Sequence, residues 1–538
     1  MGAIQVEGGQ CRQAHGKWPG QETVANGVHV YESDLVRAWY HCVPLLMSNL
    51  LLPLLVTGAI AATSCAVPLS ADDVQPNIVF IMIDDLGWMD IHPQGNEQFV
   101  TPNLDRFAKQ STRFTDFYAA APVCSPTRAA CITGLAPARL KVTNHIPDRW
   151  NFYDQPASQK QAPRVGRPWG PAKSRNVLDK HYRTIAQRLQ KDGYHTGFVG
   201  KWHLAGPDWN TTDTSMFPEA YGFDVNVAGN AMGGPGTFHA PIKMPNYKKG
   251  EKGDYLPNML AKEAVDYMAS VKDDEQPFFL CLWTYTVHYP IEATPALYQK
   301  YTEQRNPDGS VKEPDMKTRY RAMVEGMDQA VGRVLAAIDD LGMADNTLVV
   351  FTSDNGQMPG ASVADPLRAA KGYLYEGGIR VPMMMRWPGR IPAGALSSTP
   401  AISMDFAPTF LAAAGIDYEA DEFDGESLLS LASDQSRLHR DAIFLHFPHY
   451  CYHGKNDMAS VVRMGDLKYI HHWDNANHEL FDLRADIGER NNLYSAQQGV
   501  AAKLKARLDT WLRDTEAELP RRYETIPAGE MPGKKRAG

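Results

Sequence analysis

An uninterrupted apolar run at residues 78–83 is the feature that most constrains how this chain can fold. A run of this length, preceded by Pro76, is typical of a parallel β-strand that is buried on both faces. It ends at Asp84 and Asp85, and the carboxyl ends of strands are where open α/β sheets bind their ligands. Two buried carboxylates are costly unless a cation compensates them. The pair therefore indicates either a hard divalent ion or an acidic cap on the next turn.

A second strand-like run, at residues 347–352, also ends in polar residues. Asp354 and Asn355 lie just beyond it, so a second strand delivers a carboxylate and an amide oxygen. Together with Asp84 and Asp85 they form an all-oxygen set. Such a set favours Ca²⁺ or Mg²⁺ over Zn²⁺, whose usual ligands are Cys and His.

Strand-like and helix-like segments alternate along most of the chain, which predicts an α/β fold. Further strands are expected at 195–199 and 277–284, and helices at 101–111, 184–193 and 323–341. Beyond about residue 440, short β-like runs precede a helix at 501–513. This pattern predicts a smaller C-terminal antiparallel sheet with one helix.

The segment 124–134 carries a cysteine in a helix-start context. Pro126 fixes φ and lacks an N–H group, which suits the first turn of a helix. Cys124 would then lie at the helix N-terminus, where partial positive charge lowers the pKa of a thiol. Simple core packing is the alternative, because free cysteines are often buried. Cys131 falls on the same helix face and is expected to be a core residue.

Basic and imidazole side chains follow other predicted strands. Lys201 and His203 come after the strand at 195–199, and they share one face if the chain stays extended. His288 follows the strand at 277–284. Taken singly, Lys201 is better explained as a solvated charge and His203 as a satisfied polar residue, and a lone His such as His288 is usually a packing or surface residue.

The charge balance and the N-terminus bear on location and partners. A net charge of −8 argues against a nucleic-acid binder, which would carry a Lys/Arg excess.

The apolar run at 45–62 and the small residues after it resemble a secretory signal peptide, so we expect an exported, periplasmic or extracellular protein. Residues 47–75 would be the signal peptide and linker, and 1–46 an extension or a mis-assigned start. A retained membrane anchor is the alternative, but Pro53 disfavours it. Cys65 is a weak candidate for lipidation.

Few cysteines remain once the leader is removed. Of the seven in the chain, four follow it: Cys124, Cys131, Cys281 and Cys451. Their scattered spacing predicts neither a disulfide framework nor a Cys-x-x-Cys metal site.

Five ordered motifs resemble those of the type I sulfatases. They are Asp84-Asp85, Cys124 to Gly134 (Cys-x-Pro-Thr-Arg and a later Thr-Gly), Gly200 to Leu204 (Gly-Lys-Trp-His-Leu), His288 to Pro290, and Lys371 to Pro382 (Lys, then Tyr-Glu-Gly-Gly-x-Arg-x-Pro). Ala205 departs from the family's glycine. The resemblance implies an alkaline-phosphatase-like fold, with a large, mixed, mostly parallel sheet flanked by helices. A catalytic domain at 76–425 and a C-terminal subdomain at 426–538 would follow.

The resemblance also implies cofactors. Cys124 would be converted to formylglycine by a formylglycine-generating maturation enzyme, and the hydrate of formylglycine would be the nucleophile. A Ca²⁺ ion, rather than Mg²⁺, would be bound by Asp84, Asp85, Cys124, Asp354 and Asn355.

The resemblance to the type I sulfatases also implies roles for the remaining motif residues. Arg128 would stabilise the hydrate and the metal ligands, and His203 would hydrogen-bond or deprotonate the hydrate. Lys201, Lys371 and His288 would bind the substrate. Lys371 and His288 would flank the leaving oxygen, with His288 as the proton donor.

The implied activity is hydrolysis of a sulfate ester, and Trp, Tyr and His residues in the loops favour a sulfated saccharide over an aryl sulfate. A phosphoric or phosphonic ester hydrolase and a catalytically dead carbohydrate-binding protein are the alternatives. His446, His449 and His453 cluster in a loop predicted from the sequence, and they either contact substrate or lie at the surface or at an interface. Residues 146–180, rich in Pro, Arg, Lys and Trp, are expected to form either a long functional loop or a family-specific insertion near the mouth of the site.

Overall fold

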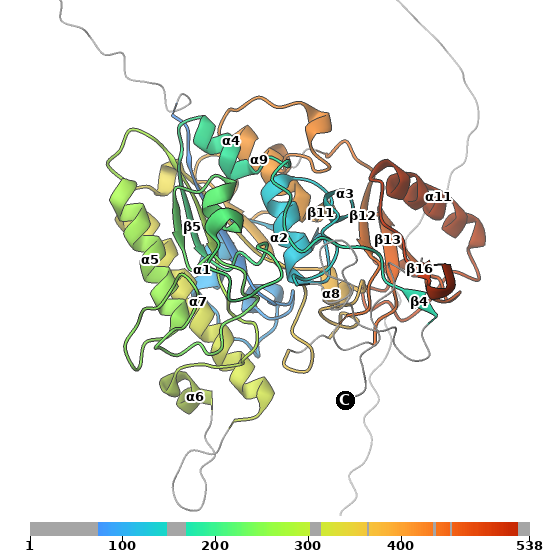
Figure 1. Ribbon diagram of the computed structural model, residues 1–538, viewed down its shortest axis with the longest axis horizontal. Helices are drawn as coiled ribbons and strands as arrows, with labels where there is room; N and C mark the ends of the chain where they lie inside the picture. The colour runs from blue at the N-terminus through green and yellow to red at the C-terminus, as the bar shows by residue number, and fades with distance from the viewer. Residues whose placement is uncertain are drawn as a thin grey trace, which may run out of the picture. The chain divides into compact units, whose positions relative to one another are not determined.

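The computed structural model describes residues 74–147, 168–301, 314–362, 365–433, 437–451 and 455–525 of the 538-residue chain (Figure 1). The expected signal peptide, Cys65, His453 and most of the 146–180 segment lie outside these ranges. Within the described ranges, no helix is both long and apolar enough to cross a membrane.

An eight-stranded sheet organises the larger part of the fold. Its strands, in spatial order, are β10 (Leu396–Ser397), β2 (Thr112–Phe114), β9 (Met383–Arg386), β8 (Thr347–Ser353), β1 (Asn77–Ile83), β7 (Phe278–Trp283), β5 (His195–Gly200) and β6 (Val225–Val227). Strands β8, β1, β7, β5 and β6 are parallel, whereas β9 pairs antiparallel with both β8 and β2. The sheet is therefore mixed and mostly parallel, as predicted.

Strand β1 lies in the middle of this sheet and is buried on both faces. Ile78, Phe80 and Met82 pack into one hydrophobic core, and the alternate residues Val79 and Ile81 pack into a second core. This alternation follows from the two-residue period of a strand. A strand with no exposed face has to be apolar at every position, which explains the uninterrupted run in the sequence.

Helices cover both faces of the sheet. The core around Phe80 includes residues of α2 (Cys124–Thr133), α4 (Ile185–Lys191) and α9 (Phe406–Ala413). The core around Val79 includes residues of α1 (Pro102–Lys109), α5 (Leu256–Val271) and α7 (Met316–Asp340). Figure 1 shows α5 and α7 side by side in yellow-green. The predicted helices are present at 101–111, 184–193 and 323–341, and α7 extends further toward its N-terminus than the apolar pattern indicated.

The smaller elements lie around this framework. Short helices are α3 (Pro137–Leu140), α6 (Pro295–Tyr301), α8 (Glu376–Ile379) and α10 (Leu429–Ser433). Two-stranded sheets pair β3 (Phe117–Tyr118) with β11 (Ala401–Ile402), and β4 (Trp169–Gly170) with β16 (Arg521–Arg522).

The C-terminal region forms the expected antiparallel sheet with one helix. Strands β12 (Ala442–Phe447), β13 (Ala459–Met464), β14 (Leu467–His472) and β15 (Glu479–Asp482) pair in sequence order, and α11 (Gln498–Asp514) follows them. Val462 packs with Leu504 and Leu508 of α11, whereas Val461 packs with Tyr118 and other residues of the larger part. The small sheet is therefore covered on both faces, by its own helix and by the larger part of the fold.

A buried ionic cluster joins β14 to α8. The Lys468 Nζ lies 2.8 Å from Glu376 Oε1 and 2.7 Å from Glu489 Oε1. Arg380 donates to the other oxygen of Glu376 at 2.7 Å, and Glu489 accepts the backbone N–H of Glu376 at 2.7 Å. Burial raises the pKa of Glu489 to about 7, although Lys468 opposes this shift. Lys468 is thus the cation on which two buried carboxyl groups depend.

The substitution Lys468→Met is therefore expected to lower the free energy of unfolding by about 3–5 kcal/mol, because it leaves buried carboxylate charge without its partner. Urea unfolding at neutral pH measures this change. Lys505→Met is the matched control, since Lys505 and Asp509 form a partly exposed pair on α11. It should cost about 0.5 kcal/mol or less. Equal losses in the two variants would contradict a structural role for the buried cluster.

Candidate active site

The central strands deliver carboxylates to one edge of the sheet. Asp84 and Asp85 follow β1, and Asp354 and Asn355 follow β8, which pairs with β1 in parallel register. The backbone N–H of Asp85 donates to Asp354 Oδ1 at 3.2 Å. All four side chains are fully buried. The structure therefore brings together the oxygen set predicted from two separate parts of the sequence.

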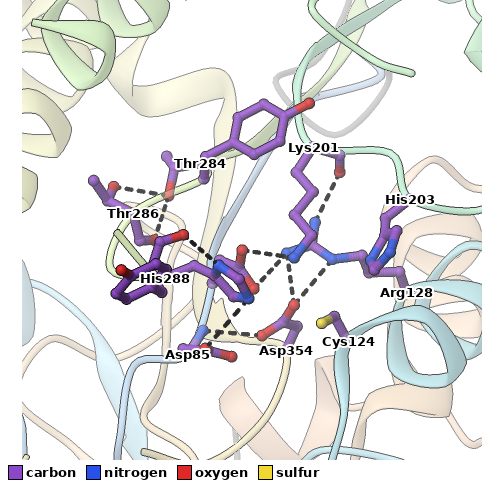
Figure 2. A network of polar contacts seen from close by, with 12 residues as sticks. Asp85, Cys124, Arg128, Lys201, His203, Thr284, Thr286, His288 and Asp354 are labelled. Carbon is purple, nitrogen blue, oxygen red and sulfur yellow. Dashed lines mark hydrogen bonds and ion pairs between the residues drawn. The ribbon is translucent and has the colours of Figure 1, made fainter. Parts of the chain in front are cut away.

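Two cations form ion pairs with Asp84 and Asp354, and Figure 2 shows Arg128 beside Asp354. Arg128, on α2, donates from Nε and Nη2 to Asp354 Oδ2 at 2.9 and 2.6 Å. Lys201 donates to Asp84 Oδ2 at 2.7 Å, and Arg128 Nη1 donates to the Lys201 carbonyl at 2.8 Å. Burial opposes ionisation of Asp354, but Arg128 holds its pKa below the ordinary value.

Lys201 follows directly on the end of β5 and contacts Asp84. Gly200 has φ +111°, and a Cβ built at this position would lie 2.0 Å from the carbonyl oxygen of Trp283 on β7. Only glycine fits so close to a neighbouring strand in this conformation. The backbones of β5 and β7 therefore approach each other closely at Gly200.

Lys371 links Asp85 to Cys124. Its Nζ lies 2.6 Å from Asp85 Oδ1 and 3.6 Å from the Cys124 Sγ. Burial lowers the pKa of Lys371, but the anionic neighbours, with Asp85 first among them, together outweigh burial and raise this pKa well above its ordinary value. Lys371 and its neighbours likewise hold the pKa of Asp85 below its ordinary value, against the effect of burial. This lysine therefore carries a permanent positive charge beside the candidate nucleophile.

Several oxygens of the cluster have no hydrogen-bond partner. They are Asp84 Oδ1, Asp85 Oδ2 and Asn355 Oδ1, all buried. Burial also raises the pKa of Asp84 well above its ordinary value, even though Lys201 opposes this effect. Buried polar atoms are normally satisfied, and a cation would satisfy these. One atom each from Asp84, Cys124 and Asp354 lie within 4.8 Å of one another, so the residues present fit a divalent ion.

Cys124 lies at the first position of α2, and Pro126 falls in the first turn of that helix, as predicted. The expectation of a lowered thiol pKa is wrong for this structure. Burial raises the pKa of Cys124 above its ordinary value, and the nearby Lys201 and Lys371 only partly offset this effect. Cys131 is buried in the sheet's core, as expected. The described part of the chain contains four cysteines, and all of them are free thiols: Cys124, Cys131, Cys281 and Cys451.

The backbone at His203 differs from the extended conformation that was considered from the sequence. Its φ is +57°, so the chain does not stay extended after Lys201. His203 Nε2 contacts the Ile146 carbonyl, which can only accept, so this nitrogen carries the proton. Nδ1 is then an acceptor and lies 3.3 Å from the Ser125 Oγ. Burial lowers the pKa of His203 well below its ordinary value, so the ring is neutral.

His288 lies beside Asp85. Backbone hydrogen bonds continue past the paired ends of β1 and β7, from Asp84 N to Thr286 O at 2.8 Å and from Val287 N to Asp84 O at 2.6 Å. They place His288 Nε2 3.8 Å from Asp85 Oδ2 (Figure 2). Burial, followed by Lys371, lowers the pKa of His288 to about 3, so the imidazole is neutral at pH 7.

A pocket of about 540 Å³ opens onto these groups. Asp85, Cys124, His203, His288 and Lys371 all line it. Buried charges at the bottom of a pocket of this size are typical of a site for a small anionic ligand.

Comparisons with known proteins assign this site to a family. The family model described as Sulfatase matches residues 76–416, and that of the N-sulphoglucosamine sulphohydrolase C-terminal region matches 369–516. A curated sulfatase of Formosa agariphila is 30% identical over 81% of this chain and 89% of its own length.

Human arylsulfatase A is 30% identical over 81% of this chain and 88% of its own length. Pig N-acetylgalactosamine-6-sulfatase is 32% identical over 74% of this chain and 72% of its own length. The chain belongs to the sulfatase family. It is a sulfuric ester hydrolase of the alkaline phosphatase superfamily.

Solved structures agree with this assignment. The crystal structure of Ps i-CgsB superposes with a TM-score of 0.67 at 27% identity, over 82% of this chain and 93% of that one. A phosphonate monoester hydrolase of Agrobacterium radiobacter, 18% identical with a TM-score of 0.56, shares the fold alone.

Two histidines singled out in the sequence of this sulfatase lie elsewhere. His446 is on β12, where its ring contacts Ser460 and the Glu518 carbonyl, and His449 contacts Thr143. Both are buried and neither lines the pocket, so the predicted contact with substrate and the predicted surface position are wrong for them. Both ring nitrogens of His446 have hydrogen-bond partners, whereas Nδ1 of His449 has none among the described residues.

Sequence reasoning missed a glycine-rich segment, residues 233–236, that also lines the pocket. A Cβ at Gly233 would lie 2.7 Å from His203 Nε2, and a Cβ at Gly234 would lie 3.0 Å from His288 Nδ1. The Gly-Gly-Pro-Gly sequence was the available signal, but nothing local indicates which side chains it contacts.

Because the His203 ring leaves no room for a Cβ at Gly233, Gly233→Ala is expected to displace this histidine and lower the kcat of the sulfatase by roughly 10²-fold. Hydrolysis of 4-nitrophenyl sulfate measures kcat, and thermal unfolding checks the fold. Gly236→Ala is the matched control in the same segment, since a Cβ there meets no atom within 4 Å. It should lose far less activity. Similar kcat values for the two variants would contradict the role assigned to Gly233.

Proposed function

We propose that this sulfatase hydrolyses sulfate esters of saccharides, using formylglycine made from Cys124 and a bound Ca²⁺. The observation that carries the proposal is the convergence of Cys124, three carboxylates and three side-chain cations in one buried cluster. Asp84, Asp85, Asp354, Asn355 and residue 124 would hold the ion. The formylglycine hydrate would supply the attacking oxygen, and the ion would supply positive charge to the sulfate oxygens.

Charge balance within the cluster supports binding of a sulfate group. The cations Arg128, Lys201 and Lys371 balance the carboxylates of Asp84, Asp85 and Asp354, so the side chains alone have little net charge. A divalent ion would make the buried cluster positive, which suits an anionic ester and a dianionic product. Lys201 and Lys371 then bind the sulfate oxygens as point charges.

Arg128 and His203 act on the nucleophile's side of the site. Arg128 makes a two-nitrogen contact with Asp354 and so fixes the orientation of that carboxylate. His203 is neutral, with its acceptor Nδ1 near Ser125, the residue after Cys124. Because His203 and residue 124 line the same pocket, we propose that His203 accepts a proton from a hydroxyl group at position 124.

His288 and Lys371 act on the leaving group. His288 is neutral in the substrate-free protein, because burial and Lys371 disfavour its charged form. An anionic ester in the pocket offsets these cations and favours the imidazolium. His288 can then donate a proton to the departing alcohol oxygen while Lys371 stabilises the developing negative charge.

The substrate class is inferred from relatives and from the chain's own features. The related pig enzyme is named for N-acetylgalactosamine 6-sulfate, and the Ps i-CgsB structure was also solved with k-i-k-neocarrahexaose. We propose a saccharide sulfate for this chain, which would be exported by its leader and matured by a formylglycine-generating enzyme. The proposed division into a leader at 47–75, a catalytic domain at 76–425 and a C-terminal subdomain at 426–538 accompanies this assignment.

The nucleophile is tested by the mass of the peptide containing residue 124, after co-expression with a maturation enzyme. We expect loss of the thiol sulfur as an aldehyde, together with sulfate release from 4-nitrophenyl sulfate. Cys124→Ala should lower this activity by roughly 10⁴-fold or more. An unmodified, active thiol protein, or faster turnover of 4-nitrophenyl phosphate than of the sulfate, would overturn the proposal.

The proton donor is tested by the leaving-group dependence of His288→Gln. A saccharide alkoxide needs a proton to depart, whereas 4-nitrophenolate departs without one. The variant should therefore lose roughly 10²–10⁴-fold in kcat on a saccharide sulfate and much less on 4-nitrophenyl sulfate. Suitable saccharides are N-acetylgalactosamine 6-sulfate, glucosamine 2-N,6-O-disulfate and k-i-k-neocarrahexaose, which together form the saccharide panel. Equal losses on both types of ester would show that His288 is not the donor.

A further inference from the structure

Two exposed aromatic side chains stand out in the described part of the chain. Trp209 is 43% exposed and Tyr289 is 58% exposed, and no other described Phe, Trp or Tyr is exposed to this degree. Both line the active-site pocket of about 540 Å³. The other large exposed apolar residues are aliphatic or Met and lie outside the pocket lining: Val74, Val100, Val225, Met316, Leu396 and Leu519. Single exposed apolar residues are common, but two aromatic rings at one pocket indicate a contact surface.

Each of these aromatic residues is tied to a histidine of the site. The Trp209 indole N–H donates at 3.4 Å to the Ile146 carbonyl, the same oxygen that His203 contacts. His288 Nδ1 donates at 2.8 Å to the Tyr289 carbonyl. These contacts anchor one end of each residue beside the reacting groups while much of its surface remains exposed.

The pocket therefore has two chemically different zones. Cys124, His203 and Lys371 line the pocket, are almost completely buried and belong to the proposed catalytic groups. Trp209 and Tyr289, which we call the aromatic rim, are exposed to solvent and carry no charge. A substrate whose sulfate lies among the buried groups would extend its organic part toward the rim.

From this arrangement we propose that the aromatic rim is a saccharide-binding subsite, in which Trp209 and Tyr289 contact the C–H faces of a sugar ring. A pyranose has apolar C–H faces and polar hydroxyl edges. Trp and Tyr match this character because each combines a large apolar face with one polar group. The pocket volume suits a ligand larger than a sulfate ester of a small alcohol. The inference rests on the proposed function and assigns substrate recognition to two residues outside the catalytic motifs.

The test compares Trp209→Ala and Tyr289→Ala with Trp209→Phe and Tyr289→Phe, all in the formylglycine-bearing full-length enzyme. The phenylalanine variants keep an aromatic face and remove the polar group. This separates ring contact from the hydrogen bond of Trp209 to Ile146. Leu396→Ala is the matched control, because Leu396 is 50% exposed and apolar but lies on β10, away from the pocket.

The kinetic readout is the separate measurement of KM and kcat on the saccharide panel and on 4-nitrophenyl sulfate. Each alanine variant is expected to raise KM for the best panel substrate about tenfold, with kcat changed by less than about threefold. The phenylalanine variants should stay within about threefold of the parent in KM. For 4-nitrophenyl sulfate, KM should change by less than about threefold in every variant.

A second readout is independent of turnover. Isothermal titration of the same saccharide into Cys124→Ser protein, with and without Trp209→Ala, should show the same tenfold weakening of binding. Unchanged affinity and KM in the alanine variants would overturn the proposal. So would an equal KM increase for 4-nitrophenyl sulfate, or hydrolysis of that ester with none of the panel accepted. If the parent enzyme hydrolyses no sulfate ester at all, the proposed function fails. In that case the titration tests the aromatic rim independently of catalysis. If no saccharide of the panel binds measurably, the proposed subsite is wrong as well.

Discussion

The constraint on which this structure depends is the burial of three carboxylates at one edge of a parallel sheet. Neighbouring strands β1 and β8 carry Asp84, Asp85 and Asp354 to the same place, where their charges would repel and lack water. Arg128, Lys201 and Lys371 come from three other segments, and each is within 2.7 Å of one of these carboxylates. Helix α2 carries Arg128, the segment after β5 carries Lys201, and the loop before α8 carries Lys371. These ion pairs consequently help to fix the three segments in position. The arrangement of charges that the proposed catalysis requires is therefore also the arrangement that neutralises the buried carboxylates.

The C-terminal region also contributes to the position of one of these cations, Lys371, although it lies outside the carboxylate cluster. Lys371 belongs to a segment that is bound on both sides: its backbone N–H donates to the Gln357 carbonyl at 3.0 Å, near the carboxylate cluster. A few residues later, Glu376 is held by Lys468 and by Glu489, which belong to the C-terminal region. A segment anchored at both ends has few alternative conformations, so it can hold a charged lysine in the buried interior. The small sheet therefore stabilises the loop that brings Lys371 to Cys124.

The parts of the fold that were predictable from sequence are those encoded by local pattern. The apolar run of β1 shows that the strand is buried on both faces, and the positions of Asp84 and Asp354 after two such strands bring their carboxylates together. The pKa of Cys124 was not predictable, because a helix N-terminus is local whereas the burial that outweighs it depends on distant packing. The conformation of His203 and the contact of Gly233 with its ring depend in the same way on segments remote in sequence. Local patterns thus locate the charged groups, and long-range packing decides their protonation and orientation.

The division of the pocket into buried and exposed zones relates this site to the diversity of its relatives. In the proposed function the buried groups act on the sulfate, which is the same in every ester, so chemistry common to all substrates would dictate their arrangement. The remainder of the substrate differs, and in the proposed subsite it would contact Trp209 and Tyr289, which are exposed and bear no charge. Exposed rings can be exchanged at small cost in stability, whereas removing a partner from a buried ion pair is strongly destabilising. Substrate preference can therefore change at the rim while the carboxylates, the cations and the residue at position 124 stay as they are.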